Sequence, residues 1–265
     1  MCGLFLLLGC LFLGMLIDMN YPFGRQRLSR MSPIVIGGCA RSGTTLLLSV
    51  LSCHPNVYAI PVETQALCPT AYDPEPRSNV SFDVAAIQRH LHGGNVVTDC
   101  QYWCEKTPRN VMFFSRILKH FGAKLRILHV VRDGRDVVCS VHPSAPDRYW
   151  VEPKRWVKEV EAGLVLDGHP QVMTVRYEDL VLCYHETVQE ILGFLSLQHV
   201  PEMDDYPMNA KVVSDKAWFE PARAISADSV ERWRHPMQRE RVDCLLAESG
   251  ACRLLARLNY DMVGG

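Results

Sequence analysis

The sequence lacks the spacings that mark two common kinds of site. Its eleven cysteines include no Cys-x-x-Cys pair, and its ten histidines do not stand at zinc-finger distances from them, so no metal site is predicted. Because eleven is odd, at least one thiol has no partner within the chain, and we expect buried or free thiols with one or two disulfides at most. The chain also lacks a basic excess: 28 basic and 29 acidic residues give a net charge of −1. Nucleic acid is therefore not a predicted partner.

Long apolar runs are equally scarce, with one exception at the N-terminus. Residues 2–17 carry no polar side chain, and Asp18 ends the run. As a helix, this segment falls a little short of a hydrocarbon core of about 30 Å, which suits the thinner membranes of the early secretory pathway. We predict that residues 1–18 form a hydrophobic helix, a signal-anchor or short transmembrane segment. A cleaved signal peptide fits less well because no basic residue precedes the run, and a wrongly assigned start codon is the third reading.

The cellular location stays open at this point. Arg25, Arg27 and Arg30 follow the apolar run and would place the domain on the cytoplasmic side of a membrane. The sequon Asn79-Val80-Ser81 instead favours a lumenal chain. Two locations fit the sequence: a Golgi membrane if the organism is a eukaryote, and the cytoplasm if it is a bacterium.

The rest of the chain shows no repeat and divides simply into a short basic linker, 19–32, and one domain, 33–265. Apolar runs alternate with helical patterns, which predicts an α/β fold: a P-loop-type parallel sheet with helices on both faces. The expected strands are 33–38, 125–131 and 172–175; the expected helices are 44–51, 111–121, 188–197, one beginning in 133–142, and much of 228–258; residues 68–81 are expected to form a loop.

The strongest local signal is a glycine-rich turn between the first expected strand and the first expected helix. The sequence Gly-Cys-Ala-Arg-Ser-Gly-Thr-Thr spans residues 38–45. Such a turn points backbone N–H groups and a helix N-terminus at one place, which suits an anion. The spacing is that of a Walker A loop, but Thr44 stands where the lysine should be, and Arg41 supplies positive charge instead. A strand–helix turn without a ligand is the alternative.

A second anion site is predicted where the strand 125–131 ends. Arg132 follows that strand, and Ser140 comes eight residues later. Together they can hold one phosphate, the arginine through charge-assisted hydrogen bonds and the serine through a neutral one. The alternative is a structural ion pair between Arg132 and Asp133. Two anion sites at the carboxyl ends of two strands predict a ligand with two separated phosphate-like groups.

These segments resemble sulfotransferases that use 3′-phosphoadenosine-5′-phosphosulfate (PAPS). Arg-Ser-Gly-Thr-Thr resembles their 5′-phosphosulfate loop, and Arg132 with Ser140 resembles their 3′-phosphate site. Four further segments resemble family elements in the same order, and the resemblance covers about residues 33–261, except 65–102. These segments are 104–110, 175–180 with 194–197, 229–234 and 258–260. Tyrosylprotein sulfotransferases are a close comparison because His54-Pro55 and Glu63-Thr64 are similar to their motifs, the latter one residue out of register.

The resemblance implies a metal-free sulfotransferase with PAPS as co-substrate and a hydroxyl-bearing acceptor: protein tyrosine, carbohydrate, lipid or small molecule. It implies that Arg41 and Lys106 neutralise the leaving 5′-phosphate and that Glu63 is the general base, with His54 as the second candidate. The alternatives without a catalytic role are a solvated carboxylate for Glu63, a surface ion pair with Glu105 for Lys106, and a packing role for His54. The remaining cofactor-binding residues implied are Ser42, Gly43, Thr44, Thr45, Arg132, Ser140 and Ser229.

Two other functions stay open from the sequence. A P-loop kinase would need ATP, Mg²⁺ and an acidic residue at a strand end, a place that Asp133 could take, but the missing lysine argues against it. A non-catalytic nucleotide-binding protein on the same fold would bind the ligand without transfer. The sequence also permits a homodimer and membrane anchoring through residues 2–17.

Overall fold

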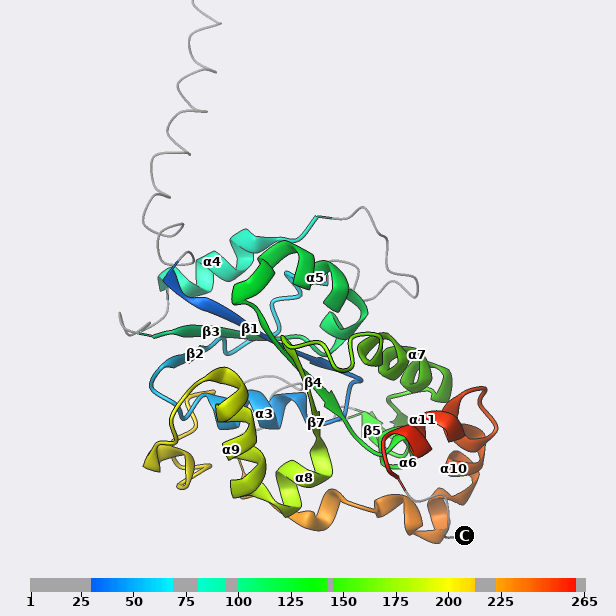
Figure 1. Ribbon diagram of the computed structural model, residues 1–265. Helices are drawn as coiled ribbons and strands as arrows, with labels where there is room; N and C mark the ends of the chain where they lie inside the picture. The colour runs from blue at the N-terminus through cyan, green and yellow to red at the C-terminus, as the bar shows by residue number, and fades with distance from the viewer. Residues whose placement is uncertain (1–29, 69–80, 94–99, 143–144, 213–222, 261–265) are drawn as a thin grey trace, which may run out of the picture.

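A parallel sheet forms the centre of the protein. The computed structural model describes residues 30–68, 81–93, 100–142, 145–212 and 223–260. Its main sheet has five strands, all parallel, in the order β2-β3-β1-β4-β7 (Figure 1). The strands are β1 (Ser32–Gly38), β2 (Val57–Ala59), β3 (Tyr102–Lys106), β4 (Arg126–Val131) and β7 (Val172–Arg176). Because the strands are parallel, their carboxyl ends lie along one edge, which is where open α/β sheets bind ligands.

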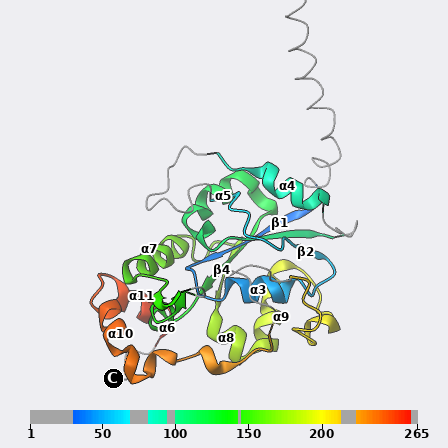
Figure 2. The same ribbon diagram turned by 180° about the vertical axis from the view of Figure 1, so that it is seen from behind.

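Helices cover both faces of this sheet, as Figures 1 and 2 show from opposite sides. One face carries α3 (Thr44–Leu51), α8 (Tyr177–Leu182) and α9 (Tyr184–Leu195); the other carries α4 (Val84–Gly93) and α5 (Phe114–Phe121). A third group packs beyond the end of β4: α6 (Gly134–Val138), α7 (Pro153–Leu164), α10 (Arg239–Leu246) and α11 (Ala251–Arg257). A small antiparallel pair, β5 (Val141–His142) and β6 (Ala145–Tyr149), completes the strands. The 3-10 turns are η1 (Pro108–Phe113), η2 (Gly122–Lys124), η3 (Pro201–Met203), η4 (Ala227–Ser229), η5 (Arg232–Arg234) and η6 (Pro236–Gln238).

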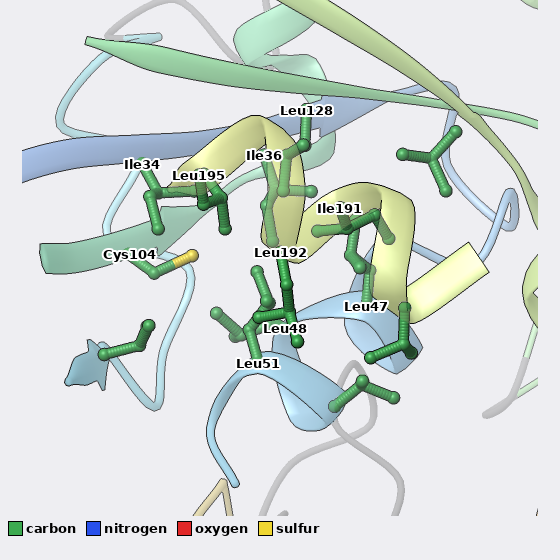
Figure 3. Close-up of a cluster of buried hydrophobic side chains, with 14 of the residues drawn as sticks. Ile34, Ile36, Leu47, Leu48, Leu51, Cys104, Leu128, Ile191, Leu192 and Leu195 are labelled. Atoms are coloured by element: carbon green, nitrogen blue, oxygen red, sulfur yellow. The ribbon is translucent and has the colours of Figure 1, made fainter. Parts of the chain in front are cut away.

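The core follows from the alternation of side chains along the strands. Ile34 and Ile36 of β1 point to the α3 and α9 face and pack there with buried leucines of both helices (Figure 3). Val35, between them, points to the opposite face and joins the cluster under α4 and α5. A central strand with both faces covered therefore needs a continuous apolar run, which is what the sequence of β1 provides.

One polar side chain is buried in this core without a hydrogen bond. His129 on β4 is fully buried, and neither ring nitrogen has a hydrogen-bond partner among the described residues. Its ring meets the edge of Phe114, 5.8 Å between centroids, and a Cβ on Gly163 of α7 would lie 2.2 Å from its Cε1 atom. Burial lowers the pKa of His129 from 6.5 to about 4, so the imidazole is neutral at physiological pH.

The predicted α/β architecture with helices on both faces is confirmed, and the three expected strands are present within one residue of their bounds. The first expected helix is also confirmed, since α3 spans Thr44–Leu51. The predicted hydrophobic helix 1–18 lies outside the described residues, as does most of the expected loop 68–81. Among the described helices, none combines the length and the apolar character needed to cross a membrane.

Two expectations are corrected. The helix expected in 133–142 ends at Val138, and the chain then enters the antiparallel pair, because Val141 and His142 bond to β6. Residues 228–258 are less helical than expected: three 3-10 turns precede α10, and Pro236 opens the last of them. The strands β2 and β3 were not predicted. Both are short. β2 pairs with β3, and β3 pairs with β1, so the pairing joins distant parts of the chain.

Candidate active site

The glycine-rich loop after β1 takes the shape that the sequence predicts. Arg41 and Gly43 both have positive φ angles, 68° and 94°, and Gly43 is the N-cap of α3. Only glycine fits at position 38, because a Cβ on Gly38 would lie 2.2 Å from the carbonyl oxygen of Val130 on the neighbouring strand. The loop therefore turns sharply and presents the N-terminus of an eight-residue helix to the carboxyl edge of the sheet.

The loop also holds an unused hydrogen-bonding group. Ser42 is fully buried, and its hydroxyl has no hydrogen-bond partner among the described residues. A buried polar atom without a partner is costly, and a phosphate oxygen in this turn would satisfy it. The donor chemistry of the loop, backbone N–H groups with the hydroxyls of Ser42, Thr44 and Thr45, fits an oxyanion.

A single cavity brings the two predicted anion sites together. It has a volume of about 520 Å³, and both Arg41 and Arg132 line it. Gly43, Thr44 and Thr45 also line the cavity, whereas Ser42 and Lys106 do not. Glu63 and Ser229 line it as well. A molecule with two separated anionic groups can thus reach both arginines from one connected space.

Arg132 is held firmly at its place beyond β4. Its side chain is nearly buried; one guanidinium nitrogen donates to the carbonyl oxygen of Arg41 at 3.0 Å and another donates to that of Ser229. The guanidinium lies 4.4 Å from the ring centroid of Tyr177 and 3.8 Å from a carboxylate oxygen of Asp136. The sequence alternative, an ion pair of Arg132 with Asp133, is not what forms, because Asp133 pairs with Arg135 at 2.7 Å.

Lys106, at the end of β3, is buried and paired with the predicted base. Its Nζ atom donates to Glu63 Oε1 at 2.5 Å and to the hydroxyl of Thr45 at 3.0 Å. Burial lowers the pKa of Lys106, and the neighbouring Glu63 carboxylate opposes that shift. The alternative of a surface ion pair with Glu105 is wrong: Lys106 has no exposed surface, and its salt bridge is with Glu63.

Glu105 points to the other side of the strand and is fully buried. Its carboxylate accepts hydrogen bonds from Thr64, Thr107 and Asn110. Burial raises its pKa, and these hydrogen bonds oppose the rise. The group thereby connects the loop that carries Glu63 to the segment that carries Lys106.

The comparison with known families decides what kind of enzyme has this site. A model of the sulfotransferase family matches residues 33–94 and 82–202. The chain belongs to the sulfotransferase family. The match contains both arginine sites, Glu63 and Lys106, and it confirms the predicted enzyme class, a sulfotransferase that uses PAPS.

Curated relatives of this sulfotransferase include protein-tyrosine sulfotransferases. Protein-tyrosine sulfotransferase 2 of Gallus gallus is 23% identical over 291 residues, covering 93% of this chain and 74% of that protein. The protein-tyrosine sulfotransferase of Drosophila melanogaster is 25% identical over 238 residues, covering 80% of this chain but 45% of the fly protein. Protein-tyrosine sulfotransferase 1 of Danio rerio is 25% identical, and this chain spans 61% of its length.

Solved structures with the same fold are also sulfotransferases. The sulfotransferase domain from the curacin biosynthetic pathway superposes with a TM-score of 0.56 at 15% identity, covering 88% of this chain and 99% of that one. The sulfotransferase domain from the Synechococcus PCC 7002 olefin synthase gives 0.54 at 17% identity, covering 88% and 97%. At these identities the likeness establishes the fold alone.

Two predicted residues of this sulfotransferase are engaged elsewhere. The Ser140 hydroxyl donates to the carbonyl oxygen of Asp136 at 3.0 Å, and Ser140 is not among the residues lining the cavity. Both ring nitrogens of His54 bond to the backbone: Asn56 N–H donates to Nδ1 at 3.1 Å, so Nε2 carries the proton and donates to the carbonyl oxygen of Gln198 at 3.0 Å. His54 therefore has the packing role given as its alternative.

The cavity also contains residues that sequence reasoning missed. Arg109, Arg155 and Arg223 line it and add positive charge beside Arg41 and Arg132. Arg109 follows Lys106-Thr107-Pro108 directly, so its place beside the predicted lysine was an available signal. Arg155 carried no such signal, because its helix α7 reaches the cavity only through tertiary packing; its Nε donates to Glu159 at 3.0 Å. Within the described ranges, no group of three His, Cys, Asp or Glu side chains is placed to hold a metal ion.

Proposed function

We propose that this sulfotransferase transfers the sulfuryl group of PAPS to the phenolic hydroxyl of a tyrosine in a protein. The donor follows from the family. The tyrosine acceptor is supported by the printed names of the curated relatives in chicken, fruit fly and zebrafish. The chain spans 74%, 45% and 61% of those proteins, so their names support a tyrosine acceptor for this chain without establishing it.

The residues divide between the two ends of the donor. The loop 41–45 holds the 5′-phosphosulfate through its backbone N–H groups and the hydroxyls of Ser42, Thr44 and Thr45, and Arg132 holds the 3′-phosphate, with Ser229 beside it. Charge-assisted hydrogen bonds from a guanidinium are the strong kind. Ser140 joins the 3′-phosphate site only if its hydroxyl turns from the Asp136 carbonyl oxygen to the phosphate.

Transfer needs a cation at the leaving group and a base at the acceptor. The acceptor oxygen attacks sulfur, the bond between sulfur and the bridging oxygen breaks, and 3′-phosphoadenosine-5′-phosphate leaves with the bonding electron pair. Lys106 and Arg41 stabilise the charge that develops on the leaving phosphate. Glu63 takes the phenolic proton. Glu63 lines the cavity, and its salt bridge of 2.5 Å brings it to the ammonium of Lys106, which is buried and does not itself line the cavity.

One observation carries this proposal: Arg41 and Arg132 line the same cavity, and Glu63 lines it too. A kinase would bind ATP with Mg²⁺, whereas this cavity is lined by arginines and has Thr44 in place of the Walker lysine. Comparing the thermal shift produced by 3′-phosphoadenosine-5′-phosphate with that produced by ATP–Mg²⁺ separates the two functions. A larger shift with ATP–Mg²⁺ would contradict the proposal.

The acceptor is tested by incubating the full chain with radiolabelled PAPS and a tyrosine-containing peptide library. The matched control is the same library with phenylalanine at each tyrosine position. We expect label in the first library only. Equal labelling of both, or labelling of glycans in place of tyrosine, would refute a tyrosine acceptor.

The role of Glu63 is tested by the acidity of the acceptor. Glu63→Gln should lower kcat with the tyrosine peptide by about 10²- to 10⁴-fold and leave the affinity for 3′-phosphoadenosine-5′-phosphate unchanged by calorimetry. A small phenol that is already ionised at neutral pH needs no base, so its turnover should fall far less. Equal losses with both acceptors would place the base elsewhere.

We further propose that residues 2–17 anchor the enzyme in a Golgi membrane, on the strength of the uncharged apolar run and the family resemblance. Carbonate extraction of cell membranes tests this, since an anchored chain stays in the pellet. The homodimer stays a prediction, for which sedimentation of the detergent-solubilised chain is the measurement.

A further inference from the structure

The fully buried carboxylate of Glu105 lies behind the catalytic pair and outside the cavity lining. We propose that Glu105 is a positioning residue: it fixes the loop that carries Glu63 to the strand that carries Lys106, and so sets the distance between base and cation. The inference rests on the proposed function, from which the roles of Glu63 and Lys106 come.

The hydrogen bonds of Glu105 reach both sides of the catalytic pair. Its Oε1 atom accepts from the backbone N–H of Thr64 at 3.3 Å and from the Thr64 hydroxyl at 2.9 Å. The same oxygen accepts from the Thr107 hydroxyl at 2.6 Å, and Oε2 accepts from the Asn110 amide at 2.6 Å. Thr64 is the residue after Glu63, and Thr107 is the residue after Lys106. One carboxylate therefore holds the immediate neighbours of both catalytic groups.

Two further bonds make this connection rigid. The Thr107 hydroxyl, which donates to Glu105, accepts from the backbone N–H of Gln65 at 3.3 Å. The Asn110 amide also donates to the carbonyl oxygen of Ile36 on the central strand at 3.2 Å. The loop, β3 and β1 are thus joined through a buried network in which each member bonds to the next, and such networks fix a single arrangement.

Glu105 cannot act on the substrate itself. Successive side chains of a strand point to opposite faces, so Lys106 meets Glu63 and Thr45 while Glu105 meets the loop from behind. A buried carboxylate is costly unless it is hydrogen-bonded. Glutamine would be the less costly residue here, but its amide N–H₂ would face either the backbone N–H of Thr64 or the side-chain N–H₂ of Asn110, which are both donors. The site thus requires a group that only accepts.

The charge of Glu105 has a second effect on Lys106. The described charged groups that act on this ammonium are Glu63, from the loop, and Glu105, from its own strand; helix α3 contributes the neutral hydroxyl of Thr45. Burial lowers the pKa of Lys106, and both carboxylates raise it. Removing the Glu105 charge lowers the pKa of Lys106 further, and the cation is then lost at a lower pH.

The experiment compares Glu105→Gln, Thr64→Val and Thr64→Ser with the wild-type full chain. Turnover is measured with radiolabelled PAPS and the tyrosine peptide library, and affinity is measured by calorimetry with 3′-phosphoadenosine-5′-phosphate. We expect Glu105→Gln to lower kcat by about 10²-fold, as a small misplacement of catalytic groups does, while Kd changes less than about threefold. Its alkaline loss of kcat should begin at lower pH than in the wild type.

The threonine variants separate positioning from charge and from folding. Thr64→Val keeps the shape and removes the hydroxyl. Its kcat should fall about five- to tenfold, which corresponds to the loss of one hydrogen bond, and the pH at which kcat declines on the alkaline side should not change. Thr64→Ser restores the hydroxyl and should restore kcat. Glu178→Gln is the matched control: it removes a buried carboxylate that accepts from Asp133 N–H and the Tyr260 hydroxyl, away from the pair, and should retain kcat.

The outcomes are distinct. If the wild type neither binds 3′-phosphoadenosine-5′-phosphate nor transfers label, the proposed function fails. If the wild type is active and both Glu105→Gln and Thr64→Val keep its kcat, the positioning role is wrong. If Glu105→Gln does not fold, Thr64→Val alone decides the matter. An equal loss of kcat and of nucleotide affinity would also overturn the inference, because it would mark a general loss of structure.

Discussion

The buried histidine of the core makes stability depend on pH in a calculable way. His129 has a pKa of about 4 in the folded protein against 6.5 for an ordinary histidine. Between these values the unfolded chain binds a proton that the folded chain does not, so the free energy of unfolding falls as the pH falls below 6.5. At about 1.4 kcal/mol for each pH unit, the full loss is about 3 kcal/mol, and about 2 kcal/mol of it is reached between pH 7 and pH 5.

The assay is urea unfolding of the full chain in mild detergent, followed by the fluorescence of its five tryptophans. His129→Leu removes the titrating group, so its stability should fall less than that of the wild type between pH 7 and pH 5, by about 2 kcal/mol. Phe114→Leu is the control: it removes the neighbouring ring and should lower stability equally at both pH values. If the free energy of unfolding fell by the same amount between pH 7 and pH 5 in the wild type and in His129→Leu, the reasoning would be refuted.

Three more predictions concern the cavity and its loop. Arg132→Ala should raise the Kd for 3′-phosphoadenosine-5′-phosphate about 10- to 100-fold, because charged hydrogen bonds are lost. The Kd for adenosine 5′-phosphate, which has no 3′-phosphate, should change little. Calorimetry with both nucleotides checks this, and an equal loss of affinity for both would place Arg132 at the other phosphate. Lys106→Ala should lower kcat about 10²- to 10³-fold in the radiolabel assay, and near-normal turnover would exclude the lysine from the leaving-group site. Gly38→Ala places a Cβ 2.2 Å from the Val130 carbonyl oxygen, so nucleotide binding and thermal stability should both fall; an unchanged melting temperature would show that the loop can shift.

Local patterns predicted the parts of the fold that depend on neighbouring residues. The apolar run of β1, the glycine turn and the helix α3 follow one another in the sequence, and each step favours the next. The location of Arg41 and Arg132 at one edge of the sheet was also predictable, because the parallel strands β1 and β4 end at the same edge. The cavity that both line agrees with that expectation.

The rest depended on contacts between distant segments. Nothing local in Tyr-Trp-Cys-Glu-Lys marks β3 as a buried strand, because its last two residues are charged. Partners from the loop 63–65, from Thr45 and from the turn after β3 compensate for their burial. Ser140 was assigned from spacing within an expected helix, but α6 ends at Val138 and the serine bonds to its own backbone. Arg41, Arg132 and Glu63 thus line one cavity, as the sequence led us to expect, whereas Ser140 does not line it.

The C-terminal segment closes the cavity around Arg132. The carbonyl oxygen of Ser229 accepts from Arg132, and the Asp136 carboxylate accepts from the backbone N–H groups of Glu231 and Trp233 at 2.9 Å. The surroundings of Arg132, the residue that we propose binds the 3′-phosphate, are therefore complete only when the segment 229–233 has packed against it. A bound nucleotide stabilises only the arrangement that binds it, so we expect it to protect the segment 229–233 from proteolysis.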